Sequence, residues 1–373
     1  MTATLAFTQA AWDGLRATLD ADVETACVLL ARSVGDLTGD ITLLVRDIVT
    51  VPHAAYEIRT GDHLSITSSG WLPAFARADA EECVPLFMHT HPGSRAEHSA
   101  LDLALDDALA RVADVRLARG AYGSFVLGGS SDKPTFAGRL TARGDHWTSL
   151  DRVRVVGHRL TLYARDGVAP LPVFDRQVRA FGDEGQKLLG QLRVGVVGAG
   201  GTGSAAVEQL VRLGVGSVVV VDPQTLADTN VTRVYGSTLA DVSRPKVDIA
   251  AEHTASIGLD ASIVAVQGSI LHQETIMALR HCDVVLGCTD DHAGRLVLTR
   301  LPQALLQLLI DCGVVLDSRA GSLFDIFARV SVVTPTTACL VCMGDVDPDK
   351  ARLEALSDEE RQSLIRQGYA PEL

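Results

Sequence analysis

The sequence predicts an α/β protein with two domains, an α+β domain over residues 1–165 and a domain of β-α-β units over residues 174–373. Three observations support this division. The chain has 373 residues, more than a single hydrophobic core usually organises. Residues 166–173 contain two prolines and no apolar periodicity, which predicts a linker. Beyond it, a glycine-rich turn follows an apolar strand and opens a helix, as in β-α-β units.

The elements predicted in the first domain are short and mixed. Apolar residues at four-residue steps predict an amphipathic helix over residues 7–19. Helical periodicity also predicts a helix over residues 100–112. Half-buried strands are predicted over residues 27–31, 41–51, 84–89 and 124–127. This mixture is typical of an α+β domain.

In the second domain, strands alternate with helices. A strand over 194–197, a helix over 204–213 and a strand over 217–221 form the first β-α-β unit. Two further strands are predicted over 263–266 and 284–286. Residues 347–366 mix acidic and basic side chains, which favours a solvated helix.

The composition limits the partners. Hydrophobic residues make up 47% and charged residues 21%, as in an ordinary globular protein. The net charge of −13 argues against a nucleic-acid partner and an anionic membrane surface. No secretory signal or membrane-spanning apolar run is evident, so we expect a cytoplasmic protein. The seven cysteines are then expected to be mostly reduced thiols.

The first candidate site is a group of metal-binding residue types. His89 and His91 stand at i and i+2 near a strand end, so both point to the same side. Asp102 begins a helix, with Ser99 three residues earlier as a candidate cap. Three N and O ligands leave a fourth zinc position for water, which is the arrangement of a hydrolytic site. The alternative is a pair of surface histidines; His98, between the ligands, is expected to face solvent.

This string resembles the JAMM motif of the JAB/MPN metalloprotease family, and Glu24 stands where that family places its upstream glutamate. The resemblance implies that His89, His91 and Asp102 bind zinc. It also implies that Glu24 is the general acid/base and that Ser99 helps to stabilise the tetrahedral oxyanion. A solvated Glu24 is the alternative, because glutamates are common.

The second candidate site is the glycine-rich turn. Its glycines let backbone N–H groups approach phosphate at the positive end of a helix; they are Gly198, Gly200, Gly201 and Gly203. Asp222, at the end of the next strand, suits a ribose hydroxyl. The turn alone fits a dinucleotide-dependent oxidoreductase equally well.

Polar residues downstream of the turn separate the two interpretations. Arg233 and Lys246 can neutralise a triphosphate and the departing pyrophosphate, and Asp290 can hold Mg²⁺ between phosphate oxygens. Hydride transfer has no evident need for these groups, whereas adenylation by ATP does. The series therefore favours an adenylating enzyme.

Residues 174–344 resemble the ThiF/MoeB family and the adenylation domains of ubiquitin-activating enzymes. The resemblance implies a Rossmann-like domain in which Asp222 binds ribose and Asp290 binds Mg²⁺. It assigns phosphate contacts to Asn230, Arg233 and Lys246. It also implies a homodimer in which Arg176 reaches the ATP of the partner subunit.

The sequence departs from the ThiF pattern at several positions. Gln224, Val234 and Asp291 replace an acidic residue, a Gln and an Asn of the family. Cys339 and Cys342 match half of the family's structural zinc site, but no second C-x-x-C follows, and a simple buried pair is the alternative. We expect Cys312 to be a core strand residue rather than a nucleophile.

Both resemblances imply action on the C-terminal glycine of a ubiquitin-like protein. We therefore predict that the second domain adenylates that glycine and that the zinc site hydrolyses bonds at the same terminus, in maturation or deconjugation. Such fusions resemble components of bacterial ubiquitination-like operons, some linked to phage defence, with a ubiquitin-conjugating-enzyme-like partner. The alternatives are activation of a sulfur-carrier protein for cofactor or cysteine synthesis and a catalytically silent scaffold.

Overall fold

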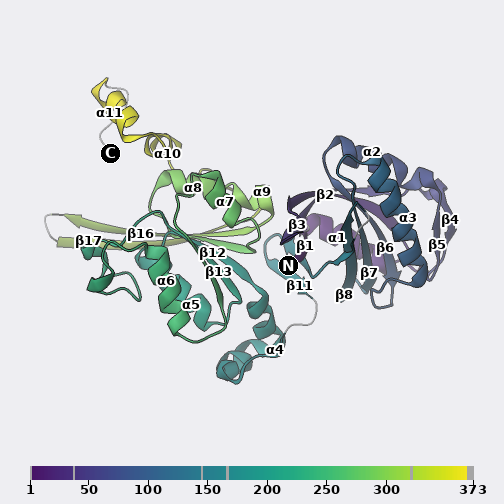
Figure 1. Ribbon diagram of the computed structural model, residues 1–373, viewed down its shortest axis with the longest axis horizontal. Coiled ribbons are helices and arrows are strands. Elements are labelled where there is room, and N and C mark those ends of the chain that lie inside the picture. Colours follow the sequence, from purple (N-terminus) through teal and green to yellow (C-terminus); the bar gives the residue numbers. More distant parts are fainter. Residues whose placement is uncertain (1, 37, 144–145, 165–167, 320–321, 368–373) are drawn as a thin grey trace. The chain divides into compact units, whose positions relative to one another are not determined.

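The computed structural model describes residues 2–36, 38–143, 146–164, 168–319 and 322–367. The chain divides into two compact units, Met1–Arg165 and Asp166–Leu373 (Figure 1). Part of the predicted linker, residues 166–167, lies outside the described residues. The α/β class and the order of an α+β domain followed by a parallel-sheet domain are confirmed.

The first unit is built on a nine-stranded mixed sheet in the order β11-β10-β1-β3-β2-β6-β7-β8-β9. At its centre, β6 (Val84–Pro92) pairs antiparallel with β2 (Ala26–Gly35) and parallel with β7 (Ala121–Gly129). The other strands of this sheet are β1 (Ala3–Thr8), β3 (Ile41–Thr50), β8 (Pro134–Ala142), β9 (Thr148–Ser149), β10 (Arg152–Val156) and β11 (Leu160–Ala164). A separate hairpin consists of β4 (Tyr56–Arg59) and β5 (Leu64–Ile66).

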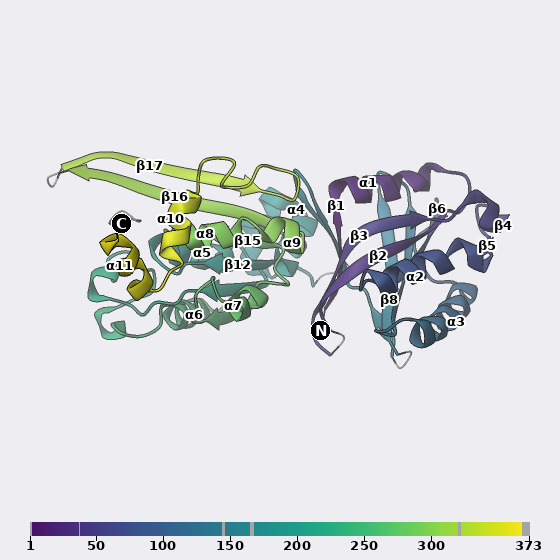
Figure 2. The same cartoon turned by 90° about the horizontal axis from the view of Figure 1, so that it is seen from above.

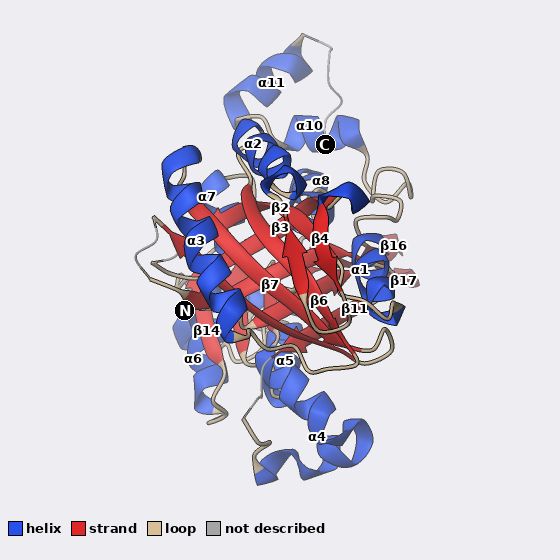
Figure 3. Ribbon diagram, turned by 90° about the vertical axis from the view of Figure 1, so that its right-hand side faces the viewer, coloured by secondary structure: helices blue, strands red, loops and turns tan. Residues whose placement is uncertain are grey.

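Helices cover both faces of this sheet (Figures 2 and 3). Helix α1 (Gln9–Ala17) packs Trp12 into the cluster on one face. Helices α2 (Leu72–Ala80) and α3 (Ala100–Arg116) lie across the other face, where they bury Phe75 and Leu109. The sheet is therefore the middle layer of three.

The predicted helix over residues 7–19 begins too early. Residues 3–8 form strand β1, and Phe7 is buried in the sheet. The helix starts only after Thr8, whose hydroxyl accepts a hydrogen bond from the Ala11 amide at 3.3 Å. A β-branched residue that also caps a helix suits this junction of strand and helix.

The second unit has a six-stranded sheet in the order β14-β13-β12-β15-β16-β17, parallel except for the last strand. The strands are β12 (Arg193–Val197), β13 (Ser217–Val221), β14 (Ser262–Val266), β15 (Val284–Gly287), β16 (Leu308–Arg319) and β17 (Ser322–Val333). The strand order reverses between β12 and β15. In doubly wound sheets, ligands bind at this switch point, outside the carboxyl ends of the strands.

Helices of the second unit pack on both faces of its sheet. Helices α5 (Gly201–Arg212) and α6 (Lys246–Ser256) bury valines on one face. Apolar residues from the remaining sheet-packing helices cover the other face: α7 (Gln273–Ala278), α8 (His292–Leu298), α9 (Leu301–Leu305) and α10 (Pro348–Glu354). This two-sided cover confirms the predicted Rossmann-like architecture.

Two segments of the second unit, α4 (Asp175–Gln191) and the β16–β17 hairpin, extend beyond the sheet and the helices that cover it. Helix α4 leads into β12 and bends at Gly182, whose φ is +76°. The long β16–β17 hairpin extends beyond its neighbours (Figure 2). The single helix predicted over residues 347–366 is two helices, α10 and α11 (Asp358–Arg366), because Ser357 caps a new one. None of the described helices is both long enough and apolar enough to cross a membrane.

Candidate metal centre and nucleotide site

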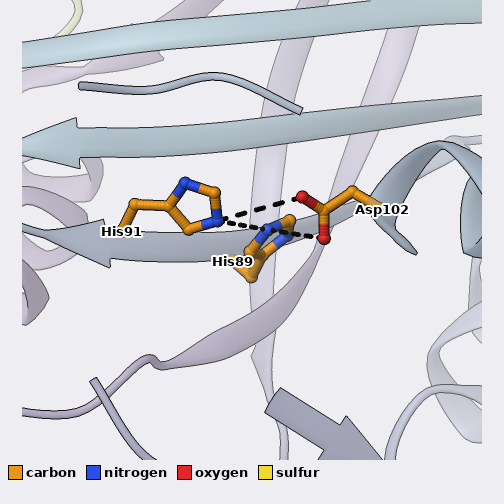
Figure 4. Close-up of side chains that lie close together, drawn as sticks. All are labelled: His89, His91 and Asp102. Carbon is orange, nitrogen blue, oxygen red and sulfur yellow. Dashed lines mark hydrogen bonds and ion pairs between the residues drawn. The ribbon is translucent and has the colours of Figure 1, made fainter. Parts of the chain in front are cut away.

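His89, His91 and Asp102 converge in the first unit (Figure 4). The two histidines lie on β6, and their Nε2 atoms are 3.1 Å apart. Asp102 lies in the first turn of α3, with one oxygen 3.3 Å from His89 Nε2 and the other 3.9 Å from His91 Nε2. Within the described residues, this is the one group of three His, Cys, Asp or Glu side chains whose ligand atoms lie close enough to hold a metal ion, all within 4.8 Å.

A helix cap positions the carboxylate of Asp102. The Ser99 hydroxyl accepts a hydrogen bond from the Asp102 amide at 3.1 Å, and the Ser99 amide donates to Asp102 Oδ2 at 2.7 Å. This capping box fixes the first turn of α3 and leaves Oδ1 facing His89. The Asp102 side chain is therefore oriented before any ligand binds.

The protonation states suit a metal ligand set. Burial and the charge of His89 lower the pKa of His91, which favours the neutral imidazole that binds metals. Burial opposes ionisation of Asp102, but hydrogen bonds from His89 and Ser99 outweigh it and lower the pKa of its carboxyl. Two imidazole nitrogens and a carboxylate directed at one point fit a zinc ion with an open position.

The structure brings Glu24 to the same point. Glu24 immediately precedes β2, where its amide donates to the Thr60 carbonyl at 2.7 Å and its carbonyl accepts from Arg59 Nε at 2.8 Å. Its Oε1 is 3.6 Å from His91 Nε2. The side chain is buried, and burial raises the pKa of its carboxyl.

A cavity of about 230 Å³ opens beside these groups. The metal-ligand group and Glu24 line it, together with Asp62 and His63 from the β4–β5 hairpin. Sequence reasoning missed these two hairpin residues, because nothing in their spacing links them to β6. The cavity can hold a small peptide segment next to the metal ligands.

The expectation that His98 faces solvent is wrong. Its side chain is 11% exposed, and Nε2 lies 3.1 Å from the Ser124 hydroxyl and 3.8 Å from Asp106 Oδ2. Burial and the Arg139 charge lower the pKa of His98 to about 4. Asp106 follows Asp102 by one helical turn, so its inward position could have been read from the sequence, whereas Ser124 comes from β7 and could not.

The glycine turn of the second unit lies at the switch point, between the end of β12 and helix α5. Gly198 has a φ of +95°, and a Cβ atom there would lie 2.7 Å from the Cys288 carbonyl oxygen. A Cβ atom on Gly203 would lie 1.6 Å from the Gly198 oxygen. A Cβ atom on Gly200 would have no neighbour within 4 Å, and one on Gly201 would lie 3.5 Å from the Arg233 side chain. The outer glycines thus form the turn, and the inner two leave room for a ligand.

Asp222 holds the turn from the end of β13. Its carboxylate accepts hydrogen bonds from the amides of Ala199 and Gln224, each at 2.7 Å. The side chain is buried. Asp222 therefore fixes the backbone of the turn, a role that the sequence did not indicate.

Lys246 is a buried cation next to this turn. Its ammonium donates to Gln224 Oε1 at 2.6 Å, and no carboxylate pairs with it among the described residues. A buried charge that faces only an amide is poorly compensated. Because Gln224 stands where the ThiF pattern has an acidic residue, Lys246 has an amide rather than a carboxylate as its partner at this position.

The other predicted nucleotide ligands are more exposed. Asn230 accepts a hydrogen bond from the Ala227 amide at 3.3 Å, and Arg233 donates to the Thr229 carbonyl at 3.1 Å. Asp290 is exposed beyond the end of β15. Arg176 is exposed on α4, which enters β12 at its amino end, whereas the glycine turn follows the carboxyl end (Figure 1). The structure thus gathers Arg233 at the turn but leaves Arg176 away from the turn of its own chain.

Two other departures from the ThiF pattern have structural roles. Asp291 caps helix α8 by accepting a hydrogen bond from the Gly294 amide. Val234 is buried in a small cluster with Leu226 and Ile249. Both residues therefore stabilise local structure near the turn.

The cysteines differ in their surroundings. Cys339 and Cys342 have their sulfurs 3.5 Å apart, and no third metal ligand joins them among the described residues. Cys312 lies on β16, as predicted, but it is half-buried rather than in the core. Its thiol lies close to that of Cys288, and this interaction lowers the pKa of Cys312.

The second unit is a doubly wound domain with a glycine turn at its switch point, and the first unit holds a His-x-His and aspartate cluster. These features define a protein with a candidate nucleotide site and a candidate metal centre. Residues 174–363 match the ThiF family, and residues 14–140 match prokaryotic homologs of the JAB domain. The chain belongs to the ThiF family.

Three curated relatives each match part of the chain. A tRNA threonylcarbamoyladenosine dehydratase of Bacillus subtilis is 38% identical over 94 residues, 25% of this chain and 37% of that protein. A molybdopterin-synthase adenylyltransferase of Escherichia coli is 34% identical over 124 residues, 33% of this chain and 50% of that protein. A SAMP-activating enzyme E1 of Haloferax volcanii is 34% identical over 117 residues, 31% of this chain and 43% of that protein. The chain thus spans half or less of the length of each.

Proposed function

We propose that this protein adenylates the C-terminal carboxylate of a ubiquitin-like or sulfur-carrier protein with ATP·Mg²⁺ and hydrolyses bonds made at that same terminus with a zinc centre. One observation carries the proposal. A single chain combines a ThiF-family domain with a His89, His91 and Asp102 cluster that has a buried carboxylate 3.6 Å away. One site would make an activated bond at the carboxylate, and the other would cut a bond there.

In the hydrolytic half, His89, His91 and Asp102 would hold zinc, which when bound lowers the pKa of water toward about 7. Glu24 is placed to take a proton beside His91 and to pass it to the leaving amine, because burial raises the pKa of its carboxyl. The Ser99 oxygen accepts from the Asp102 amide, so its own proton is free to hydrogen-bond to an oxyanion.

In the adenylating half, the backbone of the glycine turn and the start of α5 would receive the phosphates. Lys246 and Arg233 would neutralise charge on the triphosphate and the leaving pyrophosphate. Asp290 would hold Mg²⁺, and Asn230 would contact phosphate. Asp222, which fixes the turn, would also accept a hydrogen bond from a ribose hydroxyl.

The ATP site is proposed to be completed in a homodimer by Arg176 of the second copy. Two features support this arrangement. Arg176 is exposed on α4, and the neighbouring Gln177 donates to the Arg212 carbonyl at the end of α5 opposite the glycine turn. The outer part of the β16–β17 hairpin also exposes large apolar side chains: Leu323, Phe324, Ile326 and Phe327 are 57–63% exposed.

The adenylating activity is tested by ATP–pyrophosphate exchange. The acceptor to try is a small ubiquitin-like protein that ends in glycine and is encoded beside this protein's gene. We expect exchange that requires this acceptor and disappears when its last glycine is removed. Exchange that requires tRNA instead of this acceptor would show that the activated carboxylate belongs to tRNA. The net charge of −13 disfavours that substrate. Tight NAD binding without an ATP preference would contradict the proposal.

The hydrolytic activity is tested with Glu24→Gln. This change should keep stoichiometric zinc but reduce cleavage of a ubiquitin-like C-terminal fusion by at least about a hundredfold, because it removes the proton carrier and leaves the ligands intact. Zinc content and cleavage are measured on the same preparation. Retained cleavage would place the base elsewhere.

A further inference from the structure

Cys288 and Cys312 lie side by side at the carboxyl edge of the parallel sheet. Strands β15 and β16 are paired so that Gly287 is opposite Asp311, and the next residues along the two strands are these cysteines. Neighbouring strands are about 4.8 Å apart, within the range of roughly 4.4–6.8 Å between Cα atoms that a disulfide spans. Both cysteines are free thiols, and their side chains lie close enough for the titration of one to depend on the other.

The two thiols are not equivalent. Cys312 is half-buried, and its interaction with the Cys288 thiol lowers the pKa of Cys312, although burial and Asp311 oppose the shift. The same interaction and burial raise the pKa of Cys288. Cys312 is therefore the thiol that loses its proton more readily, and we assign it the nucleophilic role. Cys27, Cys83 and Cys282, by contrast, are buried.

Cys288 is also packed directly against the glycine turn. Its carbonyl oxygen is 2.7 Å from the position that a Cβ atom on Gly198 would take, and its Cβ is 3.3 Å from the corresponding position on Gly203. Asp290 follows two residues later. A covalent restraint on the Cys288 sulfur would therefore act on the backbone that is expected to receive the phosphates.

We propose that Cys288 and Cys312 form a reversible disulfide with low-molecular-weight disulfides as oxidants, and that the disulfide weakens nucleotide binding. The Cys312 thiolate attacks one sulfur of glutathione disulfide, the S–S bond breaks and one glutathione leaves as thiolate. Cys288 then loses its proton to solvent and attacks the Cys312 sulfur of the mixed disulfide, releasing the second glutathione. Two protein thiols are oxidised, and one glutathione disulfide is reduced to two thiols.

The disulfide is tested on the full chain by equilibration with glutathione disulfide, blocking of the remaining thiols by alkylation and peptide mapping. We expect a linked pair of peptides carrying Cys288 and Cys312 that disappears on reduction. The exposed Cys339 and Cys342 pair is the internal control, because its oxidation shows that the oxidant reached the protein. Alkylated Cys288 and Cys312 in a sample whose control pair is oxidised would overturn the proposal.

Single substitutions test the order of the two steps. Cys288→Ser should stop the reaction at a glutathione adduct on Cys312, whereas Cys312→Ser should leave Cys288 free of glutathione. An adduct on Cys288 in the second variant would reverse the assigned roles. Circular dichroism of each variant, compared with the unsubstituted chain, identifies any loss of fold. The peptide map of the unsubstituted chain tests the disulfide even if a variant does not fold.

The effect on nucleotide binding rests on the proposed adenylating function and is measured separately. ATP·Mg²⁺ is titrated calorimetrically into reduced and oxidised chains that both carry Cys339→Ser and Cys342→Ser. We expect roughly tenfold weaker binding by the oxidised chain. Equal affinity would refute the link between the disulfide and the turn. A lack of ATP binding by the reduced chain would refute the nucleotide site, while the peptide map would still decide whether the disulfide forms.

Discussion

In the first unit, three side chains bring their ligand atoms within 4.8 Å of one another, whereas in the second unit two of the charged residues expected at the nucleotide, Arg233 and Asp290, are exposed. In the second unit, the part of the site that is already fixed is the backbone of the glycine turn, which two hydrogen bonds to Asp222 hold in place. The difference follows from the ligands. A metal ion needs several side-chain atoms at one point, while a triphosphate is long and can be bound by main-chain N–H groups and a few mobile cations.

The two sites should therefore respond differently to substitution. Removing one ligand from a convergent cluster removes much of the cation's coordination shell, and the remaining side chains cannot move to replace it because β6 and the cap of α3 fix them. Removing one cation from the nucleotide site leaves the turn and the helix terminus intact. The loss of bound ligand should therefore be nearly complete for the metal and only partial for the nucleotide.

The largest expected effect is on zinc content. In a full chain that carries Cys339→Ser and Cys342→Ser, we expect about one zinc per chain by atomic emission, because three ligands suffice for a catalytic site. Adding His89→Ala and His91→Ala should abolish it. His98→Ala, which removes a buried histidine that is not a predicted ligand, is the matched control and should keep the metal. Stoichiometric zinc in the double-alanine chain would rule out this centre.

A smaller effect is expected at Lys246. Lys246→Met should weaken ATP·Mg²⁺ binding by about ten- to a hundredfold, since a charge-assisted hydrogen bond contributes roughly 1.5–3 kcal/mol. Gln224→Glu gives Lys246 a carboxylate partner and should also weaken binding, because that carboxylate competes with phosphate. Lys187→Met removes the same charge from α4 and is the control. Unchanged affinity in Lys246→Met would show that the nucleotide binds elsewhere.

The same variant tests whether the ATP site crosses a dimer interface. Lys246→Met and Arg176→Ala chains are each expected to lose pyrophosphate exchange. Mixed dimers would contain one site with both residues intact, so mixing should restore exchange at that site. Subunit exchange is verified first by mass measurement of differently tagged chains. Failure to restore activity in mixed dimers would place Arg176 in its own chain's site or outside both sites.

The sequence was most informative where a site is local. His89 and His91 are two residues apart on one strand and so share a face, and Asp102 lies in the helical turn capped by Ser99. This short-range geometry predicted their convergence. The approach of Glu24 depends on the pairing of Ala26 with His89 between β2 and β6, which spacing alone does not contain. The JAMM resemblance, rather than any local pattern, had indicated Glu24.

Long-range packing accounts for what sequence reasoning missed. His98 turned out to be buried because its contacts come from Ser124 on a neighbouring strand and Asp106 on a helix. The Cys288 and Cys312 pair likewise depends on the register of two parallel strands. The glycine turn was found at its predicted place, but Lys246 and Gln224 are brought together by an isolated bridge between Thr225 and Pro245. Such contacts join segments that are far apart in the chain, and no sequence pattern links one segment to the other.

The smallest effect expected is that of the cap that positions Asp102. Ser99→Ala should lower the free energy of unfolding by about 1 kcal/mol, because it removes the hydroxyl that accepts a hydrogen bond from the Asp102 amide. It should also weaken zinc binding several-fold, because a first turn without a good N-cap holds Asp102 less firmly, although the amide of residue 99 can still donate to its carboxylate. Ser357→Ala removes the same kind of capping box from α11 in the second unit, so it should alter local stability without changing zinc affinity.

Ser99→Gly separates the two roles proposed for Ser99. Glycine is a good N-cap, so this variant should stay within a few tenths of a kcal/mol of the unsubstituted chain in stability, as judged by denaturant unfolding. It nevertheless lacks the hydroxyl that could hydrogen-bond to an oxyanion. If that hydroxyl acts in catalysis, Ser99→Gly should keep its zinc and lower kcat by about tenfold or more. If kcat is unchanged while zinc is retained, the Ser99 hydroxyl takes no part in catalysis, and residue 99 contributes only the helix cap that positions Asp102 opposite the histidines of β6.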